Sequence, residues 1–190
     1  MFFGTIDGQT WCPEREWQAI DYNLSRDNAA ILTVAGSLTR FLERMHGMVL
    51  QVELQDQYID QSSADEAAAL HCAKSEQILR RKVCLTHRKQ LMFDAESVLP
   101  IAPLPNTLML ELQDGERPLA SLLMDYGLSL SRLDLGITRI VGTCEWQGYW
   151  ARRSVLRSES GIQALVVEVF HPLFWQRLKM LKQHRSFQRR

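Results

Sequence analysis

The residues from Ala164 to Phe170 form an apolar run of strand length, Ala-Leu-Val-Val-Glu-Val-Phe, which His171 and Pro172 follow directly. A run without polar alternation is typical of a strand that is buried on both faces. Its single charged residue, Glu168, is costly to bury unless a partner compensates the charge. Two interpretations follow. Glu168 either reaches water or pairs with a structural arginine, or it lines an internal cavity, where burial would raise its pKa and suit it to proton transfer.

The length of 190 residues, with 46% hydrophobic and 23% charged residues, predicts one globular domain over residues 1–190. The formal net charge is zero, so no overall field attracts nucleic acid or a membrane surface. The charge is unevenly spread, because residues 179–190 carry five Lys or Arg and no acid. We expect this basic C-terminal segment to be a solvated tail.

The motifs of several site classes are missing from the sequence. The four cysteines form no CxxC pair, which excludes the common zinc and redox motifs, and the five histidines show no ligand spacing. Neither a phosphate-binding glycine loop nor a metalloprotease motif is present, so we expect no cofactor and no metal. The thiols are scattered, and the sequence shows neither a signal peptide nor an apolar run long enough to span a membrane. These features predict a cytoplasmic protein.

Hydrophobic periodicity and capping residues predict an α+β chain with a largely antiparallel sheet of about six strands and helices to one side. The predicted helices are 13–25, a helix capped by Ser37 and stopped by Gly47, 63–77, 106–113, 118–126 and 172–183. The predicted strands are 48–59, 78–86, 91–99, 129–145, 149–157 and 161–170. Hairpin-length connections between neighbouring strands favour antiparallel pairing.

Four segments, taken in their order and spacing, resemble the chorismate–pyruvate lyase family, also called 4-hydroxybenzoate synthases, and in particular its divergent branch. These segments are Ser37 to Arg40, Arg81 to Pro100, Glu116 to Leu123, and Arg152 to Pro172. The resemblance covers about residues 37–172, leaving the first 35 residues poorly matched and residues 173–190 as a C-terminal helix and basic tail. It implies a chorismate lyase-like fold in which helices enclose an internal ligand cavity.

The resemblance also implies an activity, a cofactor-free cleavage of chorismate to 4-hydroxybenzoate and pyruvate, with the product used for ubiquinone or other phenolic compounds. By the same resemblance, Arg81 binds a carboxylate of the ligand, and the backbone amides of Leu38 and Leu119 add hydrogen bonds at helix N-termini. Glu168 would face the oxygen at the para position and exchange its proton. Residues 106–126 would form a movable flap. The implied partner is a small molecule alone, bound by a monomer or small homo-oligomer.

Other interpretations stay open at this point. Leu38 and Leu119 could simply be core residues at the starts of two helices, and Arg81 could pair with Glu96 or Glu53. The same fold serves, in related families, as the effector-binding half of transcription regulators, so a non-catalytic sensor of aromatic carboxylates is the alternative function. Such regulators carry a DNA-binding winged helix ahead of this domain. Only 36 residues precede Ser37, which counts against the sensor.

Overall fold

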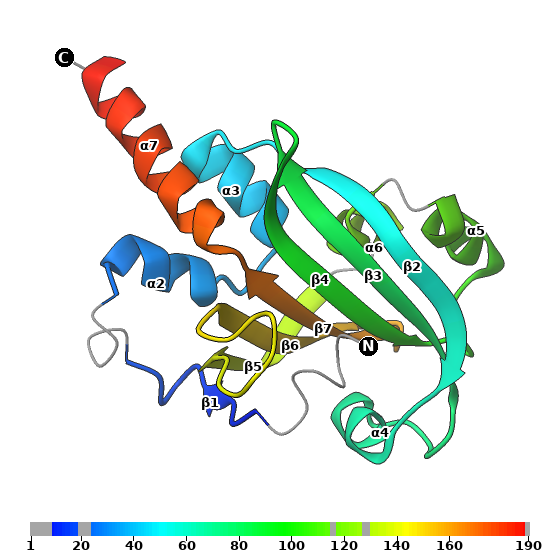
Figure 1. The fold of residues 1–190 in the computed structure, drawn as a ribbon. Helices are drawn as coiled ribbons and strands as arrows, with labels where there is room; N and C mark the ends of the chain where they lie inside the picture. The colour runs from blue at the N-terminus through cyan, green and yellow to red at the C-terminus, as the bar shows by residue number, and fades with distance from the viewer. Residues whose placement is uncertain (1–8, 19–23, 115–116, 127–129, 189–190) are drawn as a thin grey trace.

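The computed structural model describes residues 9–18, 24–114, 117–126 and 130–188, and these form an α+β fold built on an antiparallel sheet (Figure 1). Within them the sheet has seven strands in the order β1-β5-β6-β7-β4-β3-β2. The strands are β1 (Cys12–Pro13), β2 (Gln51–Gln61), β3 (Gln77–His87), β4 (Gln90–Pro100), β5 (Leu130–Arg139), β6 (Trp150–Ser158) and β7 (Gln163–Phe170). The apolar run of the sequence is therefore the central strand, β7, flanked by β6 and β4.

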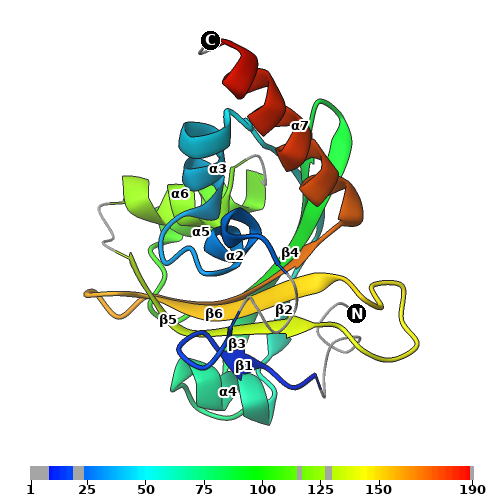
Figure 2. The same cartoon turned by 90° about the vertical axis from the view of Figure 1, so that its left-hand side faces the viewer.

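Most of the helices cover one face of the sheet, and α4 lies on the other face (Figure 2). The helices are α2 (Arg26–Leu32), α3 (Leu38–His46), α4 (Ala64–Leu70), α5 (Asn106–Asp114), α6 (Leu119–Asp125) and α7 (Pro172–Gln188). The predicted fold class is confirmed, with the two-residue β1 added at the sheet edge beside β5.

Local sequence signals account for several of these elements. Ser37 caps α3 by accepting a hydrogen bond from the Arg40 amide, and Gly47 ends the helix at φ 65°. The hairpin between β3 and β4 turns at Arg88 and Lys89, whose φ angles of 51° and 62° are those of a two-residue turn with both central residues left-handed. The turn therefore forms without the glycine that such turns favour.

The helix predicted over residues 13–25 is wrong within the described part of that segment. Pro13 lies in the edge strand β1, opposite Gly136, where a missing amide proton costs nothing to the ladder. The helix begins only at Arg26, because Ser25 caps it by accepting from the Asn28 amide. Residues 19–23 lie outside the described residues.

Three other predicted boundaries shift. The predicted helix 63–77 ends at Leu70, because His71 takes a left-handed φ of 50°. The predicted strand 129–145 ends at Arg139, and its first residue, Ser129, lies outside the described residues. The last helix, α7, extends beyond residue 183 to Gln188.

Two hydrophobic clusters lie on the helix-covered face and leave space between them. One packs α2, α3 and α7 on the strands around Phe93, Phe170 and Phe174, whose rings lie 5.1–5.9 Å apart. The other packs α5 and α6 on the far end of the same strands. A cavity lies between these two clusters.

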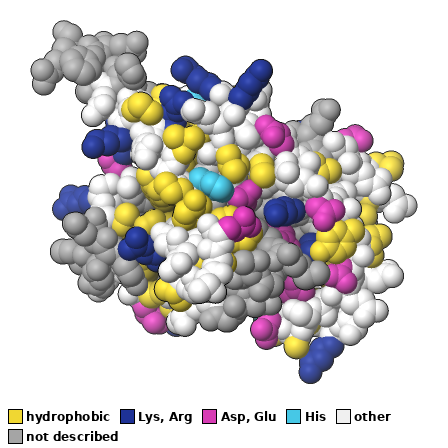
Figure 3. All heavy atoms as spheres, in the orientation of Figure 1, with side chains coloured by type: hydrophobic (Ala, Val, Ile, Leu, Met, Phe, Trp, Pro, Cys, Tyr) yellow, Lys and Arg dark blue, Asp and Glu magenta, His cyan; other side chains and the backbone are white. Residues whose placement is uncertain are grey.

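The surface carries a mixture of charges, with Lys and Arg more frequent over the upper left of Figure 3, where α3 and α7 lie. No helix among the described residues is both long and apolar enough to cross a membrane.

The opposite face of the sheet carries a buried charge cluster that holds α4. Arg80 on β3 donates to Glu66 at 2.8 Å and to Glu96 at 3.2 Å, and lies 3.5 Å from Asp60. Glu66 also completes the capping box of α4 with Ser63. Burial raises the pKa of Glu96 to about 7, although the guanidinium of Arg80 opposes that shift.

We predict that Glu96→Gln becomes more stabilising as pH rises. The folded pKa lies above the ordinary value of 4.5, so wild-type protein loses stability from this group as pH rises from about 4.5 to about 7. Glutamine carries no such cost, so the variant should be more stable than wild type above pH 7 by up to about 3 kcal/mol, and equal to it near pH 4. Denaturant unfolding at several pH values measures the difference. Glu43→Gln, on the exposed side of α3, is the control, and a pH-independent difference for Glu96→Gln would contradict the prediction.

Candidate functional site

A cavity of about 60 Å³ lies between the helix-covered face of the sheet and the first turns of α3 and α6. All four residues predicted from the sequence line it: Leu38, Arg81, Leu119 and Glu168. The other lining residues are mostly apolar and include Val83, Leu85 and Phe93 from β3 and β4 and Leu156 and Val166 from β6 and β7. Segments far apart in the sequence thus meet at one largely apolar site.

Glu168 reaches this cavity because of the strand register. It lies opposite Ala95 of β4 on one side and Arg152 of β6 on the other, and the side chain is only 8% exposed. Arg152 Nε donates to Glu168 Oε2, and Arg132 Nη1 lies 3.5 Å from the same oxygen. Both interpretations of the sequence therefore hold in part, since Glu168 lines a cavity and also pairs with an arginine.

The predicted rise in the pKa of Glu168 is wrong. Burial alone would raise it, but the positive charges of Arg152 and Arg132 and the hydrogen bond from Arg152 together hold the pKa below its ordinary value. Glu168 is thus an ionised carboxylate at neutral pH. Such a group can accept a proton or a hydrogen bond, and it is a poor proton donor.

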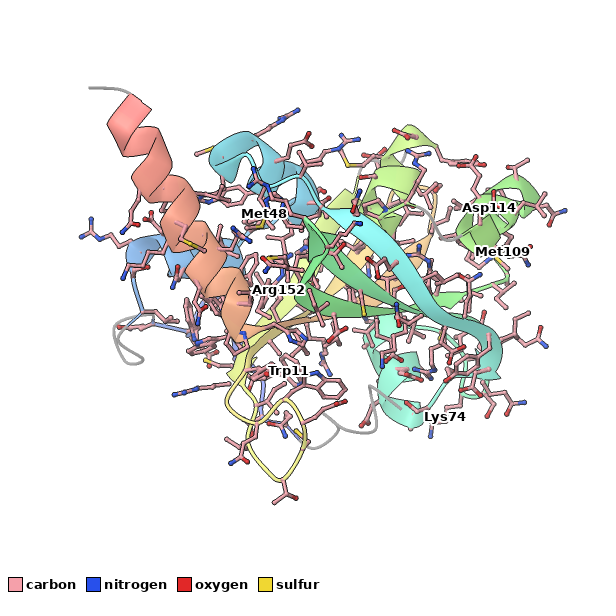
Figure 4. The ribbon with its side chains drawn as sticks, turned by 45° about the horizontal axis from the view of Figure 1, so that its top comes forward. Trp11, Met48, Lys74, Met109, Asp114 and Arg152 are labelled. Atoms are coloured by element: carbon pink, nitrogen blue, oxygen red, sulfur yellow. The ribbon has the colours of Figure 1, made fainter. Side chains whose placement is uncertain are left out.

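Arg152 fixes the position of Glu168 from behind the cavity. Its side chain is fully buried, and Nη1 donates to the carbonyls of Ile31 and Val34 at 3.2 and 3.1 Å. Figure 4 shows it in the interior, between the ribbon of α2 and the strands. The guanidinium therefore ties the end of α2 to the central strands and compensates the charge of Glu168.

Arg81 enters the cavity from β3, and this residue is only 2% exposed. Its Nη2 donates to the carbonyl of Arg117 at 3.0 Å, directly before α6 begins. Burial lowers the pKa of Arg81 to about 10, which leaves it protonated at neutral pH. Of the alternative partners, Glu96 contacts Arg80 on the other face of the sheet, and Glu53 accepts from the Thr86 hydroxyl at 3.1 Å.

Leu38 and Leu119 each combine two features. Their side chains are buried in the two hydrophobic clusters, as the plain core interpretation predicts. Their backbones begin α3 and α6, and the residues on both sides of each leucine also line the cavity. Pro118 at the start of α6 provides no side-chain cap, so the first amides of that helix receive no hydrogen bond from its side chain.

Arg132 is not among the residues predicted from the sequence, and no role in the site was predicted for Arg152. Arg132 on β5 has a side chain only 3% exposed, lines the cavity, and donates from Nη1 to Ser154 Oγ. Period-two alternation along β6 could have placed Arg152 and Ser154 on the face of Leu156. Pairing β6 with β7 would then have brought Arg152 against Glu168.

Charge in and beside the cavity is therefore biased toward positive. Among the described residues there, three guanidiniums, of Arg81, Arg132 and Arg152, face one carboxylate, that of Glu168. Buried arginines bind carboxylates well because their planar donors fit both oxygens. The arrangement suits a small anion with an apolar body.

We predict that Arg152→Met lowers the free energy of unfolding by about 3–5 kcal/mol, the usual cost of leaving one member of a buried ion pair alone. The loss should also raise the pKa of Glu168, because its nearest positive charge is gone. Denaturant unfolding measures the first effect and titration of a Glu168 carbonyl signal the second.

The matched control is Arg153→Met, the next residue on β6, which stacks on the Trp11 ring at 5.7 Å on the other face. A cation–ring contact of this kind contributes at most about 1 kcal/mol near the surface. Equal losses in the two variants would contradict the role given to Arg152.

Comparisons with known proteins bear on the family and the fold of the chain. The family model described as "Chorismate lyase" matches residues 9–180, a longer segment than the 37–172 expected from the motifs. No curated protein sequence matches the chain. Among solved structures, the effector domain of PhnF from Mycobacterium smegmatis is similar at a TM-score of 0.62 and 14% identity, covering 72% of this chain and 89% of that one.

A second similar structure is the ligand-binding domain of a putative GntR-family transcriptional regulator from Bordetella bronchiseptica. It has a TM-score of 0.56 and 13% identity, and covers 65% of this chain and 86% of that one. At these identities the two structures show a shared fold.

Proposed function

The chain belongs to the chorismate lyase family, and on that premise we propose that it is an enzyme that cleaves chorismate to 4-hydroxybenzoate and pyruvate. The observation that supports this most is the ionised Glu168, which lines a largely apolar, positively biased cavity together with Arg81 and two helix starts. Chorismate is a dianion with an apolar ring. Its carboxylates need donors, and its reaction needs a base shielded from water.

The reaction balances without any added group. The proton on the ring carbon that bears the hydroxyl leaves, and the carbon–oxygen bond to the neighbouring enolpyruvyl group breaks. The ring becomes aromatic, and the released enolpyruvate takes up one proton to become pyruvate. Because this elimination is redox-neutral, we propose that no cofactor takes part.

We assign the roles as follows. Arg81 binds the ring carboxylate, and the amides of Leu38 and Leu119 donate to the bound anion from the starts of α3 and α6. Glu168 accepts the departing proton near the para hydroxyl. Its lowered pKa keeps the group ionised before the substrate arrives.

Ligand entry requires the helices over the cavity to move. A volume of about 60 Å³ holds about four to six waters, fewer atoms than a substituted six-membered ring. The described part of the segment 106–126 borders the cavity through Leu119 of α6 and the Arg81 contact to Arg117. We propose that it opens as a flap.

The similarity to structures named effector and ligand-binding domains supports one alternative. The same cavity would then hold an aromatic carboxylate without converting it. This sensor hypothesis requires binding and no turnover, so one assay separates the two functions.

We predict that purified protein mixed with chorismate, without metal or nucleotide, releases pyruvate and 4-hydroxybenzoate in equal amounts. Coupled pyruvate detection and chromatography of the aromatic product measure both. Decay of chorismate at its uncatalysed rate would reject the lyase. Tight binding of chorismate or 4-hydroxybenzoate with no product would instead favour the sensor.

We further predict that Glu168→Gln lowers the single-turnover rate by on the order of 10²–10⁴, the usual contribution of a general base. The variant should bind 4-hydroxybenzoate at least as tightly as wild type, because a negative charge has left an anion site. Its stability should fall, since Arg132 and Arg152 lose their buried partner. A near-normal rate per folded molecule, with the folded fraction measured by circular dichroism, would exclude proton transfer by Glu168.

A further inference from the structure

We propose that Arg132 is the receptor for the second carboxylate of the substrate, that of the enolpyruvyl group, and that it keeps hold of this carboxylate on the leaving pyruvate. The proposal rests on the proposed function and adds to it the residue that distinguishes a dicarboxylate from the monocarboxylate product. No proton moves to or from Arg132. It acts by binding the substrate in the orientation from which the carbon–oxygen bond breaks.

Arg132 holds a buried position that suits it to bind a ligand. Its side chain is 3% exposed and lines the cavity, although it comes from β5 near the edge of the sheet. Its Nη1 is engaged with Ser154 and lies 3.5 Å from Glu168. Its Nε is buried and has no hydrogen-bond partner among the described residues.

A buried donor without a partner is costly, so a ligand oxygen that reached it would gain a favourable contact. Burial, together with the positive charge of Arg152, lowers the pKa of Arg132 to about 10, and the charge of Glu168 opposes this shift. An incoming carboxylate would supply the missing negative charge.

Three charged side chains follow one another across the sheet. Arg81 lies on β3, Glu168 on the central strand β7, and Arg132 on β5, with β4 between the first two and β6 between the last two. Chorismate presents its groups in the same order: the ring carboxylate, the reacting carbons, and the enolpyruvyl carboxylate. With the ring carboxylate at Arg81 and the reacting carbons at Glu168, the second carboxylate points toward Arg132.

The other arginines near the site are not placed to bind the second carboxylate. Arg152 uses Nε for Glu168 and Nη1 for the carbonyls of α2, and it does not line the cavity. Arg153 stacks on Trp11 on the opposite face. Arg157 donates to Gln163 at 2.9 Å. Arg132 is therefore the second arginine, besides Arg81, that lines the cavity in the described structure.

The test compares two stable ligands that differ in the second carboxylate, 3-(1-carboxyvinyloxy)benzoate and 3-methoxybenzoate. Isothermal titration gives the dissociation constant of each for wild type and Arg132→Met. We expect the dicarboxylate to bind at least about 30-fold more weakly to the variant, as for the loss of a buried charge pair, and the monocarboxylate to change by less than about threefold.

Three further variants complete the comparison. Arg81→Met should weaken both ligands, because both carry the ring carboxylate, and Arg153→Met, on the other face, should weaken neither. Arg132→Lys retains the positive charge beside Glu168, so it provides a folded variant to test if Arg132→Met misfolds. It should lose about tenfold or more of the preference for the dicarboxylate, because an ammonium cannot reproduce the planar fork.

Equal weakening of both ligands by Arg132→Met, or an unchanged affinity for the dicarboxylate, would overturn the proposal. So would wild-type protein that binds the two ligands equally. These outcomes do not depend on turnover. A protein that shows Arg132-dependent selectivity but no chorismate cleavage would reject the lyase alone, and a cleaving enzyme without that selectivity would reject only the role of Arg132.

Discussion

The contact between Arg152 and Glu168 is the interaction on which the rest of the site depends. It joins paired positions of the two central strands, and the same guanidinium binds the carbonyls at the end of α2. One buried side chain thus sets the position of a helix, the orientation of the only carboxylate described in the cavity, and the ionisation of that carboxylate. Removing Glu168 would leave Arg152 buried without a carboxylate, and removing Arg152 would leave Glu168 with Arg132 alone, so the fold and the ionisation of the site are coupled at this point.

The two faces of the sheet use the same residue types for opposite purposes. On the α4 face, Arg80 is surrounded by Glu66, Glu96 and Asp60, so carboxylates are in excess and the arginine is saturated. On the cavity face, arginines are in excess over Glu168. The first arrangement holds a helix in place and offers nothing to an anion. The second retains positive charge inside an apolar enclosure, where an anion is attracted strongly because water screens little.

Much of the fold was predictable because its signals are local. Ser37 and Gly47 mark the ends of α3, and the apolar run around Glu168 marks a central strand. The family resemblance then placed Leu38, Arg81, Leu119 and Glu168 at one cavity, where the structure has them. Their roles remain predictions.

What escaped prediction depends on pairing between strands. Arg132 reaches the cavity from a strand with an irregular register between Leu133 and Gly136, which period-two counting cannot anticipate. The sign of the pKa shift of Glu168 failed for the same reason, since it is set by two arginines of neighbouring strands rather than by its own apolar neighbours in sequence. The same compensated glutamate bears on the choice between catalysis and sensing. A receptor for anions gains affinity from arginines and loses it through a nearby carboxylate, so a cavity built only to bind would be better without Glu168. In this chain the fully buried Arg152 holds the Glu168 carboxylate ionised. A second arginine, Arg132, lies beside the same carboxylate and lines the cavity. That arrangement weakens ground-state binding of an anion, and it is the arrangement that the proposed lyase would need for a base at the point where a proton leaves.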